Sequence, residues 1–477
     1  MLFRSGDFPA IGGDLDGFAT LDELDGTSWE AVGIGDDGAA AVLGARSAAT
    51  GKVWFAVDDG EIWIVWDGPF TGGPLDTVTL YDGAPIEELW ATYADDVPGR
   101  VVAEPPTGWL DWYTFYGEVT EADIAANLAL AADSGLEVLQ IDDGWERAWG
   151  DWEANDDFPS GMSSVALSIM SAGLRPGLWM APLLVSRDSD TYAAHDDWWV
   201  RDASGAELTD RACDCATLDI TQPAAAAWIT SVIADRTSDG YTWLKLDFLY
   251  AGAREGVRYE DINGAEAYAR ATSLLRAAAG EDTWIVACGA PMLPSVGFAD
   301  SFRSGADIAF SALPDPDLAF LRWQARSTAA RGWANGRWWW NDADAVLVRA
   351  PFEAVTGAVA SQAASGGPWF LGDDLRELDA DRLATALTAA DLRGGAFVPE
   401  EPFSFVSGLD ASPVVELADS DDAVPTRWVD ADGRVLLLNL SDASIAVEGP
   451  GGTERLSGES AEAATRTLEA GAGEIWE

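Results

Sequence analysis

Two charged residues stand inside an apolar run of the sequence, Tyr241–Leu249 (YTWLKLDFL). Lys245 is one of only two lysines in the chain, and Asp247 follows it two residues later. Lysine and aspartate are rarely buried unless they are paired or take part in chemistry. In a strand, residues i and i+2 point to the same face, so we expect both side chains to project in one direction. Taken alone, the pattern also fits a buried structural ion pair.

Further charged residues follow similar apolar runs. Asp142 and Asp143 end the run LEVLQIDD, and two adjacent carboxylates can hold two sugar hydroxyls through charged hydrogen bonds. The alternatives for this pair are a metal site, although no further oxygen ligands cluster in the sequence, and a structural role for one of the two. Arg303 and Asp307 lie in SFRSGAD, where an arginine can position an aspartate and tune its pKa.

This set of residue types fits glycoside hydrolysis. That reaction needs one carboxylate that attacks or activates water and a second that protonates the leaving oxygen. The chain has 24 tryptophans, several of them near the ends of the apolar runs. Their flat faces suit sugar rings, although we expect core packing to explain more than half of them. The single histidine, His195, excludes a Ser-His-Asp triad that needs a histidine elsewhere.

The elements that must position these residues are eight apolar runs that alternate with Ala-rich helical stretches. The runs are Leu110–Phe115, Leu136–Asp143, Leu174–Pro182, Tyr241–Leu249, Thr283–Ala290, Ser301–Asp307, Gly336–Asp344 and Gly367–Asp374. Eight strands with intervening helices predict a (β/α)8 barrel, whose chemistry lies at the C-terminal ends of the strands. The segment 120–135 is a predicted helix, with Thr120 as its N-cap and Gly135 past its end. The third strand-to-helix connection, about 183–240, is long, and part of it is expected to lie over the mouth of the barrel.

Short β-like runs flank this central region on both sides. The stretch KVWFAVDDGEIWIVWDG predicts a hairpin around Asp59-Gly60, and TRWVDADGRVLLLNL predicts another around Asp432-Gly433. We therefore predict an α/β protein with three parts: an N-terminal β-sandwich domain (1–104), a catalytic (β/α)8 TIM barrel (105–397) and a C-terminal β-sandwich domain (398–477).

The charge of the chain is extreme. The formal net charge is −53, and 26 of the 28 basic residues are arginines. Phosphate would be repelled, which argues against nucleic acid or an anionic membrane as a partner. Self-repulsion opposes the compact state at low salt, but the Debye length falls to roughly 3 Å at molar salt. An acidic, nearly lysine-free composition therefore indicates adaptation to a salt-rich cytoplasm. The alternative is an acidic mesophilic protein that is not adapted to salt.

The cysteines and the N-terminus bear on disulfides, metal sites and cellular location. The spacing of Cys213 and Cys215 is poor for a bridge, and with Cys288 there are only three cysteines, so no disulfide framework is expected. No Cys/His cluster suggests zinc, and neither a metal nor another cofactor is expected. The sequence shows no signal-peptide pattern and no apolar run of 18 residues. We predict a cytoplasmic protein that does not enter a membrane.

Long motifs of the chain resemble the melibiase-type α-galactosidases of glycoside hydrolase family 36. They are GWLDWYTFYGEVTEADIAANLALA, LEVLQIDDGWERAWGDW, RPGLWMAPLLVSRDSD, DGYTWLKLDFLYAGA, VACGAPMLPSVGFADSFRSGAD and WWWNDADAVLVR, in order over about 105–375. The resemblance implies a retaining double displacement, with Asp247 as nucleophile and Asp307 as general acid/base. The substrates it implies are α-galactoside oligosaccharides.

The resemblance also implies roles around the sugar. Asp142 and Asp143 match the pair that holds the galactose 4- and 6-hydroxyls, and Lys245 would bond a substrate hydroxyl and help to keep Asp247 ionised. The other matched positions are aromatic walls at Trp112 and Trp179, a pocket cysteine at Cys288 and a sugar-contacting arginine at Arg303. Trp145, Asp151 and Trp152 are weaker candidates.

Several points stay open in this interpretation. The N-terminal domain is shorter than in many relatives, in which a loop from that domain, sometimes of a neighbouring subunit, supplies an aromatic lid; Trp54, Trp63 and Trp66 are the candidates. The number of subunits is open, homo-oligomers included. The rival functions are a raffinose-synthase-like galactosyl transferase, an α-N-acetylgalactosaminidase, which Cys288 near the 2-position disfavours, and a non-catalytic carbohydrate-binding protein.

Overall fold

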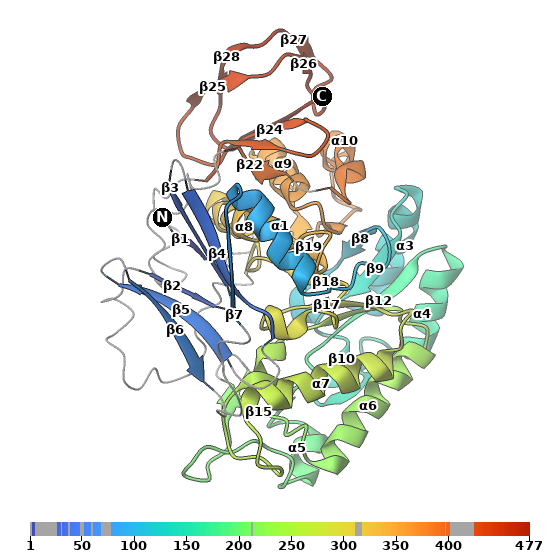
Figure 1. Ribbon diagram of the computed structural model, residues 1–477. Coiled ribbons are helices and arrows are strands. Elements are labelled where there is room, and N and C mark those ends of the chain that lie inside the picture. The colour runs from blue at the N-terminus through green and yellow to red at the C-terminus, as the bar shows by residue number, and fades with distance from the viewer. Residues whose placement is uncertain are drawn as a thin grey trace.

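The computed structural model describes most of the chain. The described residues are 2–4, 26–29, 31–36, 39–47, 52–58, 61–67, 78–210, 213–310, 317–395, 397–400 and 424–477. Sheets of antiparallel strands lie at the N- and C-terminal ends of the sequence, and parallel strands with helices lie between them (Figure 1).

A parallel sheet forms the centre of the molecule. Its order is β19-β18-β17-β16-β12-β9-β8-β21-β20, and every neighbouring pair is parallel. The strands are β8 (Thr107–Leu110), β9 (Val138–Ile141), β12 (Arg175–Met180), β16 (Trp243–Leu246), β17 (Trp284–Ala287), β18 (Ser301–Arg303), β19 (Trp340–Asp342), β20 (Ala345–Val346) and β21 (Trp369–Leu371).

The two outer strands of this sheet are consecutive in the chain. β19 and β20 are separated only by Ala343 and Asp344, and Asp344 adopts a left-handed φ of 73°. One strand position is therefore split: its first half pairs with β18, and its second half pairs with β21. This break closes the sheet into an eight-position (β/α)8 barrel, so the predicted fold is confirmed.

Helices follow the barrel strands. They are α3 (Glu121–Asp133), α4 (Met162–Ser171), α6 (Pro223–Ser238), α7 (Gly264–Ala279), α8 (Leu318–Arg331), α9 (Val355–Ser365) and α10 (Ala380–Thr388). The predicted cap of α3 is confirmed, because the Thr120 side chain accepts a hydrogen bond from the Asp123 backbone N–H. A capping box between Asn263 and Glu266 starts α7 in the same local manner.

Short elements complete the barrel region. They are α2 (Trp112–Phe115), the 3-10 turns η3 (Tyr116–Glu118), η4 (Leu249–Ala253), η5 (Leu293–Ser295), η6 (Gly332–Ala334) and η7 (Ala390–Leu392), and the hairpin β10 (Glu146–Ala148) and β11 (Asp151–Ala154). One predicted run is wrong in part: Leu110–Phe115 is not a strand beyond Leu110, because Asp111 turns into the helical region and starts α2. Short apolar runs do not distinguish a strand from a helical turn.

A long connection follows the third barrel strand, as predicted, but it ends at Gln222 rather than near 240, because α6 (Pro223–Ser238) follows it. Between β12 and α6 the chain forms α5 (Asp190–Ala194) and a small antiparallel sheet of β13 (Leu184–Ser186), β15 (Cys215–Thr217) and β14 (Thr209–Asp210). Cys213 and Cys215 form a disulfide at its edge, so the prediction that this spacing is poor for a bridge is wrong. Asp214 between them has a left-handed φ of 51°, which brings the two Cα atoms to 5.2 Å, within the range a disulfide can span.

The N-terminal part contains two antiparallel sheets and a helix. The strands are β1 (Leu2–Arg4), β2 (Gly26–Trp29), β3 (Ala31–Asp36), β4 (Ala39–Ala45), β5 (Lys52–Asp58), β6 (Glu61–Asp67) and β7 (Val78–Asp82), and the helix is α1 (Ile86–Asp96). β5 and β6 form the predicted hairpin. The lid candidates Trp54, Trp63 and Trp66 lie in these two strands, and their side chains lie outside the described part of the structure. Helix α1 packs between β4 and η6, which joins this part to the barrel.

The C-terminal part is a set of short antiparallel sheets. Its strands are β22 (Val398–Pro399), β23 (Arg427–Val429), β24 (Val435–Asn439), β25 (Ile445–Gly449), β26 (Gly452–Thr453), β27 (Ser460–Ala461), β28 (Ala464–Leu468) and β29 (Ala472–Trp476). β23 and β24 form the predicted hairpin, with Gly433 at a positive φ of 82° in its turn. β24 and β29 pack on α9 of the barrel. The exact domain boundaries at 104/105 and 397/398 stay predictions.

A helix that crosses a bilayer must be both long and apolar, which bears on the described helices of this chain. None of them is both long and apolar enough to cross a membrane.

Candidate active site

The predicted carboxylates lie where barrel strands end. Asp142 and Asp143 directly follow β9, and Asp247 directly follows β16. Because parallel strands of a barrel share one C-terminal face, these side chains gather at the same mouth. Lys245 lies within β16, and Arg303 is the last residue of β18.

Asp142 and Lys245 form a buried ion pair. The Lys245 Nζ atom lies 2.9 Å and 3.3 Å from the two carboxylate oxygens of Asp142, and the Lys245 side chain is 6% exposed. Burial disfavours the charged ammonium, but the neighbouring negative charges, that of Asp142 foremost, together outweigh this cost and raise the pKa of Lys245 above its ordinary value. Gln140 donates a further hydrogen bond to Asp142 at 2.7 Å. Lys245 is therefore a fixed positive charge at the base of the mouth.

Asp247 is held by two N–H donors. The Trp179 indole donates to Oδ2 at 3.1 Å, and the Phe248 backbone N–H donates to Oδ1 at 2.7 Å. Phe248 adopts a left-handed φ of 52°, which turns the chain sharply after the strand. The carboxylate is only partly buried, so its oxygens are fixed in position and remain within reach of a bound molecule.

Asp307 and Arg303 form the second charged centre. Arg303 is 3% exposed and contacts Asp307 at 2.8 Å, Asp344 at 2.9 Å and Asp342 at 3.4 Å. The Asp307 side chain is about a third exposed, and the rest of its surface is buried. This burial raises the pKa of Asp307, against the opposing charges of Arg303 and Lys245. Asp307 therefore keeps a proton more readily than an ordinary aspartate.

Asp143 is linked to a buried glutamate. The Trp149 indole donates to Asp143 Oδ1 at 2.9 Å. Burial and the neighbouring Asp143 raise the pKa of Glu146 well above its ordinary value, and the two carboxyls share a hydrogen bond. Burial raises the pKa of both carboxyls, so the pair keeps a shared proton more readily than two separate carboxylates would.

Aromatic side chains wall the mouth. The ring centroid of Trp149 lies 5.2 Å from that of Trp179 and 5.1 Å from that of Phe248. Trp112 lies in α2, half-buried, with its edge against Tyr116. Many other tryptophans are fully buried, as expected for core packing; these include Trp109, Trp145, Trp243, Trp338, Trp339 and Trp369.

The remaining predicted residues differ in their surroundings. Cys288 directly follows β17 and is 6% exposed; burial and the charge of Asp247 raise the pKa of its thiol well above the ordinary value. It is therefore a neutral lining group. Asp151 and Trp152 lie on β11, where Asp151 accepts hydrogen bonds from the backbone N–H groups of Asp190 and Thr191.

Four residues of this network were missed by sequence reasoning: Asp111, Glu146, Trp149 and Asp344. Asp344 accepts a hydrogen bond from the Tyr113 hydroxyl, and burial raises the pKa of Asp344 to about 7. Asp111 is fully buried, and burial together with the charge of Asp142 raises its pKa well above the ordinary range. Both follow apolar runs, so the rule that identified Asp142 and Asp247 could have found them. Glu146 and Trp149 carry no such signal.

The described residues include many acidic side chains, but these do not form a cluster of the kind that holds a metal ion. Among them, no group of three or more His, Cys, Asp or Glu side chains is arranged to hold an ion. The arrangement is instead one of paired carboxylates, two buried cations and aromatic walls.

Comparison with known proteins assigns the family. The family model "Melibiase" matches residues 104–249. The solved structure of TtGalA, an alpha-galactosidase from Thermus thermophilus in complex with p-nitrophenyl alpha-D-galactopyranoside, is 31% identical, with 79% of this chain and 78% of that chain covered and a TM-score of 0.65. The chain belongs to the melibiase-type α-galactosidases of glycoside hydrolase family 36.

Other members of this family align over less of their length or at lower identity. Alpha-galactosidase AgaA of Geobacillus stearothermophilus is 34% identical over 150 residues, which are 28% of this chain and 20% of that protein. The chain thus aligns in sequence with about a fifth of this curated relative. The solved structure of GH36 alpha-galactosidase AgaA aligns with 94% of this chain and with 71% of the AgaA chain. The alignment has 15% sequence identity and a TM-score of 0.61, which supports the shared fold.

Proposed function

We propose that the protein is a retaining α-galactosidase that removes terminal α-linked galactose from oligosaccharides. The observation that carries the proposal is that two carboxylates, Asp247 and Asp307, lie at the same barrel mouth in different surroundings. Asp247 is fixed by two N–H donors, and burial raises the pKa of Asp307. These surroundings support Asp247 as the nucleophile and Asp307 as the general acid. Relatives with this fold have been solved with p-nitrophenyl alpha-D-galactopyranoside and with stachyose.

The proposed reaction has two steps. In the first, an Asp247 oxygen attacks the anomeric carbon while protonated Asp307 gives its proton to the leaving glycosidic oxygen. The bond to the aglycone breaks, and a galactosyl-aspartate ester forms. In the second, Asp307, now ionised, takes a proton from water, which attacks the same carbon and releases Asp247. Two displacements return the α configuration.

The sugar would be held by the surrounding network. Asp142 and Asp143 supply acceptors for the 4- and 6-hydroxyls, and Lys245 and Arg303 supply charged donors from the floor. Cys288 lies near the 2-hydroxyl, where a neutral thiol leaves little room for an acetamide. Trp179, Trp149 and Trp112 offer aromatic faces for the ring. Lys245 bonds Asp142 in the described structure, so its contact to a substrate hydroxyl would be made in addition to that pair.

The test is hydrolysis of p-nitrophenyl α-galactoside at about 1 M NaCl or above, where charge is screened over roughly 3 Å. The β-galactoside and the α-glucoside are measured beside it. Release from the α-galactoside, with α-galactose as the first product in NMR, is expected. An early β-anomer would contradict retention, and turnover only with a galactosyl acceptor present would identify a transferase.

The nucleophile is tested by Asp247→Ala. We expect kcat to fall by at least about 10³-fold, with partial recovery when azide replaces the missing carboxylate. The matched control is Asp133→Ala, an exposed aspartate at the end of α3, which should keep wild-type rates. An Asp247→Ala enzyme with near-normal turnover would refute the assignment. The cytoplasmic location and the number of subunits stay predictions.

A further inference from the structure

Trp149 lies in the turn between β10 and β11, and the backbone of this turn is closely defined. Gly150 follows it with a positive φ of 108°, and a Cβ atom at Gly150 would lie 2.6 Å from a side-chain carbon of Val185. Glycine is therefore required here, because it has no Cβ and adopts such a φ without strain. The Ser186 backbone N–H donates to the Trp149 carbonyl at 2.8 Å.

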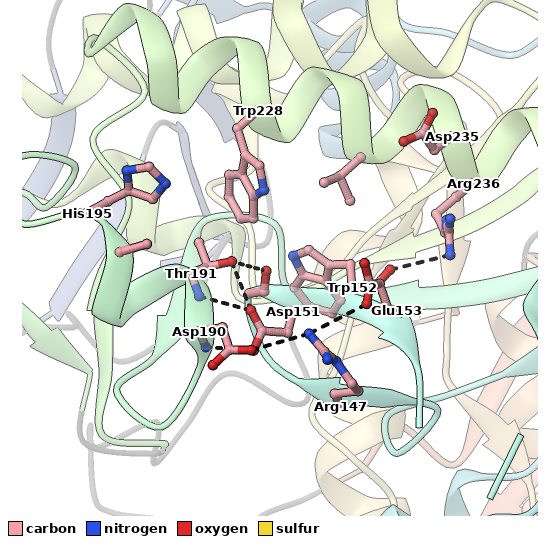
Figure 2. Close-up of a pocket in the computed structure, with 13 residues that line it drawn as sticks. Arg147, Asp151, Trp152, Glu153, Asp190, Thr191, His195, Trp228, Asp235 and Arg236 are labelled. Atoms are coloured by element: carbon pink, nitrogen blue, oxygen red, sulfur yellow. Dashed lines mark hydrogen bonds and ion pairs between the residues drawn. The ribbon is translucent and has the colours of Figure 1, made fainter. Parts of the chain in front are cut away.

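The turn is also anchored to helix α5. The Thr191 hydroxyl donates a hydrogen bond to the Gly150 carbonyl at 3.0 Å. Asp151 accepts hydrogen bonds from the backbone N–H groups of Asp190 at 2.7 Å and of Thr191 at 3.0 Å (Figure 2). Trp149 thus projects from a backbone that is held on both sides.

The Trp149 side chain contacts both halves of the proposed site. Its indole N–H donates to Asp143 Oδ1 at 2.9 Å. Its ring centroid lies 5.2 Å from that of Trp179 and 5.1 Å from that of Phe248. These two residues donate the hydrogen bonds that hold Asp247. Trp149 therefore connects a carboxylate proposed to hold the sugar with the donors of the proposed nucleophile.

The indole hydrogen bond fixes the direction of the Asp143 carboxylate. The last torsion of an aspartate side chain is broad, so donors decide where its oxygens point. Burial raises the pKa of Asp143, and the hydrogen bonds from Glu146 and Trp149 oppose this rise. The indole donor thus favours the ionised form, which accepts a hydrogen bond from a hydroxyl more strongly than a neutral carboxyl does. Asp143 is only partly buried, so a bound sugar can reach it.

We propose that Trp149 is a positioning residue that sets substrate specificity through Asp143, by holding this carboxylate toward one hydroxyl of the galactose ring. The inference rests on the proposed function and gives Trp149 a task beyond that of an aromatic wall. Because the same ring packs on Trp179 and Phe248, it also keeps Asp143 at a constant place relative to Asp247. Recognition of the hydroxyl and attack on the anomeric carbon are then aligned.

The experiment compares Trp149→Phe with the wild type on p-nitrophenyl α-galactoside and on its 4-deoxy and 6-deoxy analogues, in NaCl at about 1 M or above. Phenylalanine keeps a ring against Trp179 and Phe248 but deletes the N–H. We expect KM for the α-galactoside to rise about tenfold, the size of one hydrogen bond to a charged group, with kcat changed by less than about threefold. On the analogue that lacks the hydroxyl bound by Asp143, the rise in KM should shrink to less than about threefold.

A matched control separates this role from a structural one. Trp228→Phe makes the same change at a half-buried tryptophan of α6 that packs on Trp198, and it should leave all three substrates at wild-type rates. Circular dichroism and the unfolding midpoint establish that each variant is folded. An equal loss of Trp149→Phe on all three substrates, or an unchanged KM for the α-galactoside, would overturn the proposal.

Binding without turnover distinguishes this proposal from the proposed function. Isothermal titration calorimetry gives the Kd of galactose, 4-deoxygalactose and 6-deoxygalactose for the wild type and for Trp149→Phe. If the wild type binds galactose but does not hydrolyse the α-galactoside, the proposed function fails, and the same pattern in Kd still supports the role of Trp149. A wild type that binds no galactose would overturn both.

Discussion

Asp143 is the sugar-contacting candidate whose surroundings are most unusual. A carboxyl of high pKa, Glu146, lies behind it, and the Trp149 indole lies beside it. A protonated glutamate donates a hydrogen bond and adds no second negative charge, so it orients Asp143 without repelling it. We infer that Glu146 is a positioning residue that acts through Asp143; its own side chain is buried.

The pair Glu146→Gln and Glu146→Ala tests this role. Glutamine still donates through its amide, so we expect kcat/KM for p-nitrophenyl α-galactoside to change by less than about threefold. Alanine removes the donor, and we expect KM to rise about tenfold with little change in kcat, which corresponds to one charge-assisted hydrogen bond.

Steady-state kinetics at several pH values is the measurement. A merely structural role would predict equal losses for both variants, in parallel with a lower unfolding midpoint. Equal kinetics of the glutamine and alanine variants would therefore contradict the positioning role.

At the scale of elements, the break between β19 and β20 places a carboxylate where a continuous strand could not. Asp344 lies in the break at positive φ, between Arg303 and the Tyr113 hydroxyl. Above its own pKa of about 7 Asp344 is ionised; its charge then repels that of Asp307, and the two carboxylates compete for Arg303. Both effects favour the protonated form of Asp307, which the first step of the reaction requires.

Asp344→Asn should therefore shift the pH profile in a defined direction. Without the carboxylate, Arg303 is free to stabilise ionised Asp307, so the pKa of Asp307 falls. Because Asp307 must be protonated to act as the acid, the alkaline limb of kcat/KM should move to lower pH, by roughly 0.5–1 pH unit for a partner charge a few ångströms away. Asparagine tolerates the left-handed backbone, so the break should persist. A limb at unchanged or higher pH would contradict the coupling.

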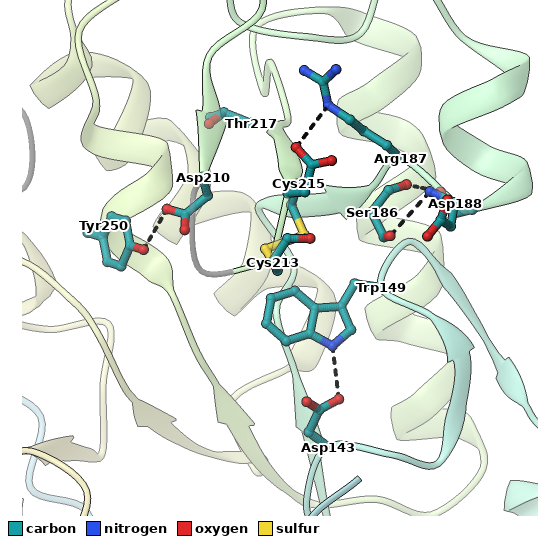
Figure 3. The surroundings of a disulfide bond; sticks show 12 residues. Asp143, Trp149, Ser186, Arg187, Asp188, Asp210, Cys213, Cys215, Thr217 and Tyr250 are labelled. Atoms are coloured by element: carbon teal, nitrogen blue, oxygen red, sulfur yellow. Dashed lines mark hydrogen bonds and ion pairs between the residues drawn. A yellow bond between two sulfur atoms is a disulfide. The ribbon is translucent and has the colours of Figure 1, made fainter. Parts of the chain in front are cut away.

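The small sheet after β12 carries the disulfide close to this mouth. Figure 3 draws Trp149 and its bond to Asp143 among the surroundings of Cys213 and Cys215. Thiol titration of the unfolded protein checks the bridge: without reductant only Cys288 should react, and with reductant all three cysteines should. Three reactive thiols in a sample that was never reduced would contradict it.

At the scale of the whole molecule, the net charge of −53 dominates. The charges repel over about 30 Å at 0.01 M salt but over only about 3 Å at 1 M. The folded chain brings these charges closer together than the unfolded chain does. Lowering the salt concentration therefore destabilises the folded state more than the unfolded state.

We expect the unfolding midpoint and the activity to fall together as NaCl is lowered from about 2 M to 0.1 M, because screening is lost. Thermal unfolding followed by circular dichroism measures this, with KCl as a second screening salt. Sucrose stabilises compact states without screening charge, so it should not replace salt fully. Full stability and activity in dilute buffer would refute the halophilic interpretation.

Local signals in the sequence determined much of this protein. The eight barrel positions, the Thr120 cap, the two Asp-Gly hairpins and the carboxylates at strand ends all follow from side-chain periodicity and turn chemistry, which act over a few residues. The roles of Asp247 and Asp307 as catalytic candidates came from the family motifs, and these roles stay predictions.

The tertiary structure alone decided how the charges pair. Lys245 binds Asp142, 103 residues earlier in the chain, rather than its neighbour Asp247. Arg303 contacts carboxylates up to 41 residues away, and burial within the closed barrel raises the pKa of Glu146. These outcomes depend on burial and on distances between residues far apart in sequence. No local pattern encodes them, because desolvation and Coulomb energies are set only once the barrel has closed.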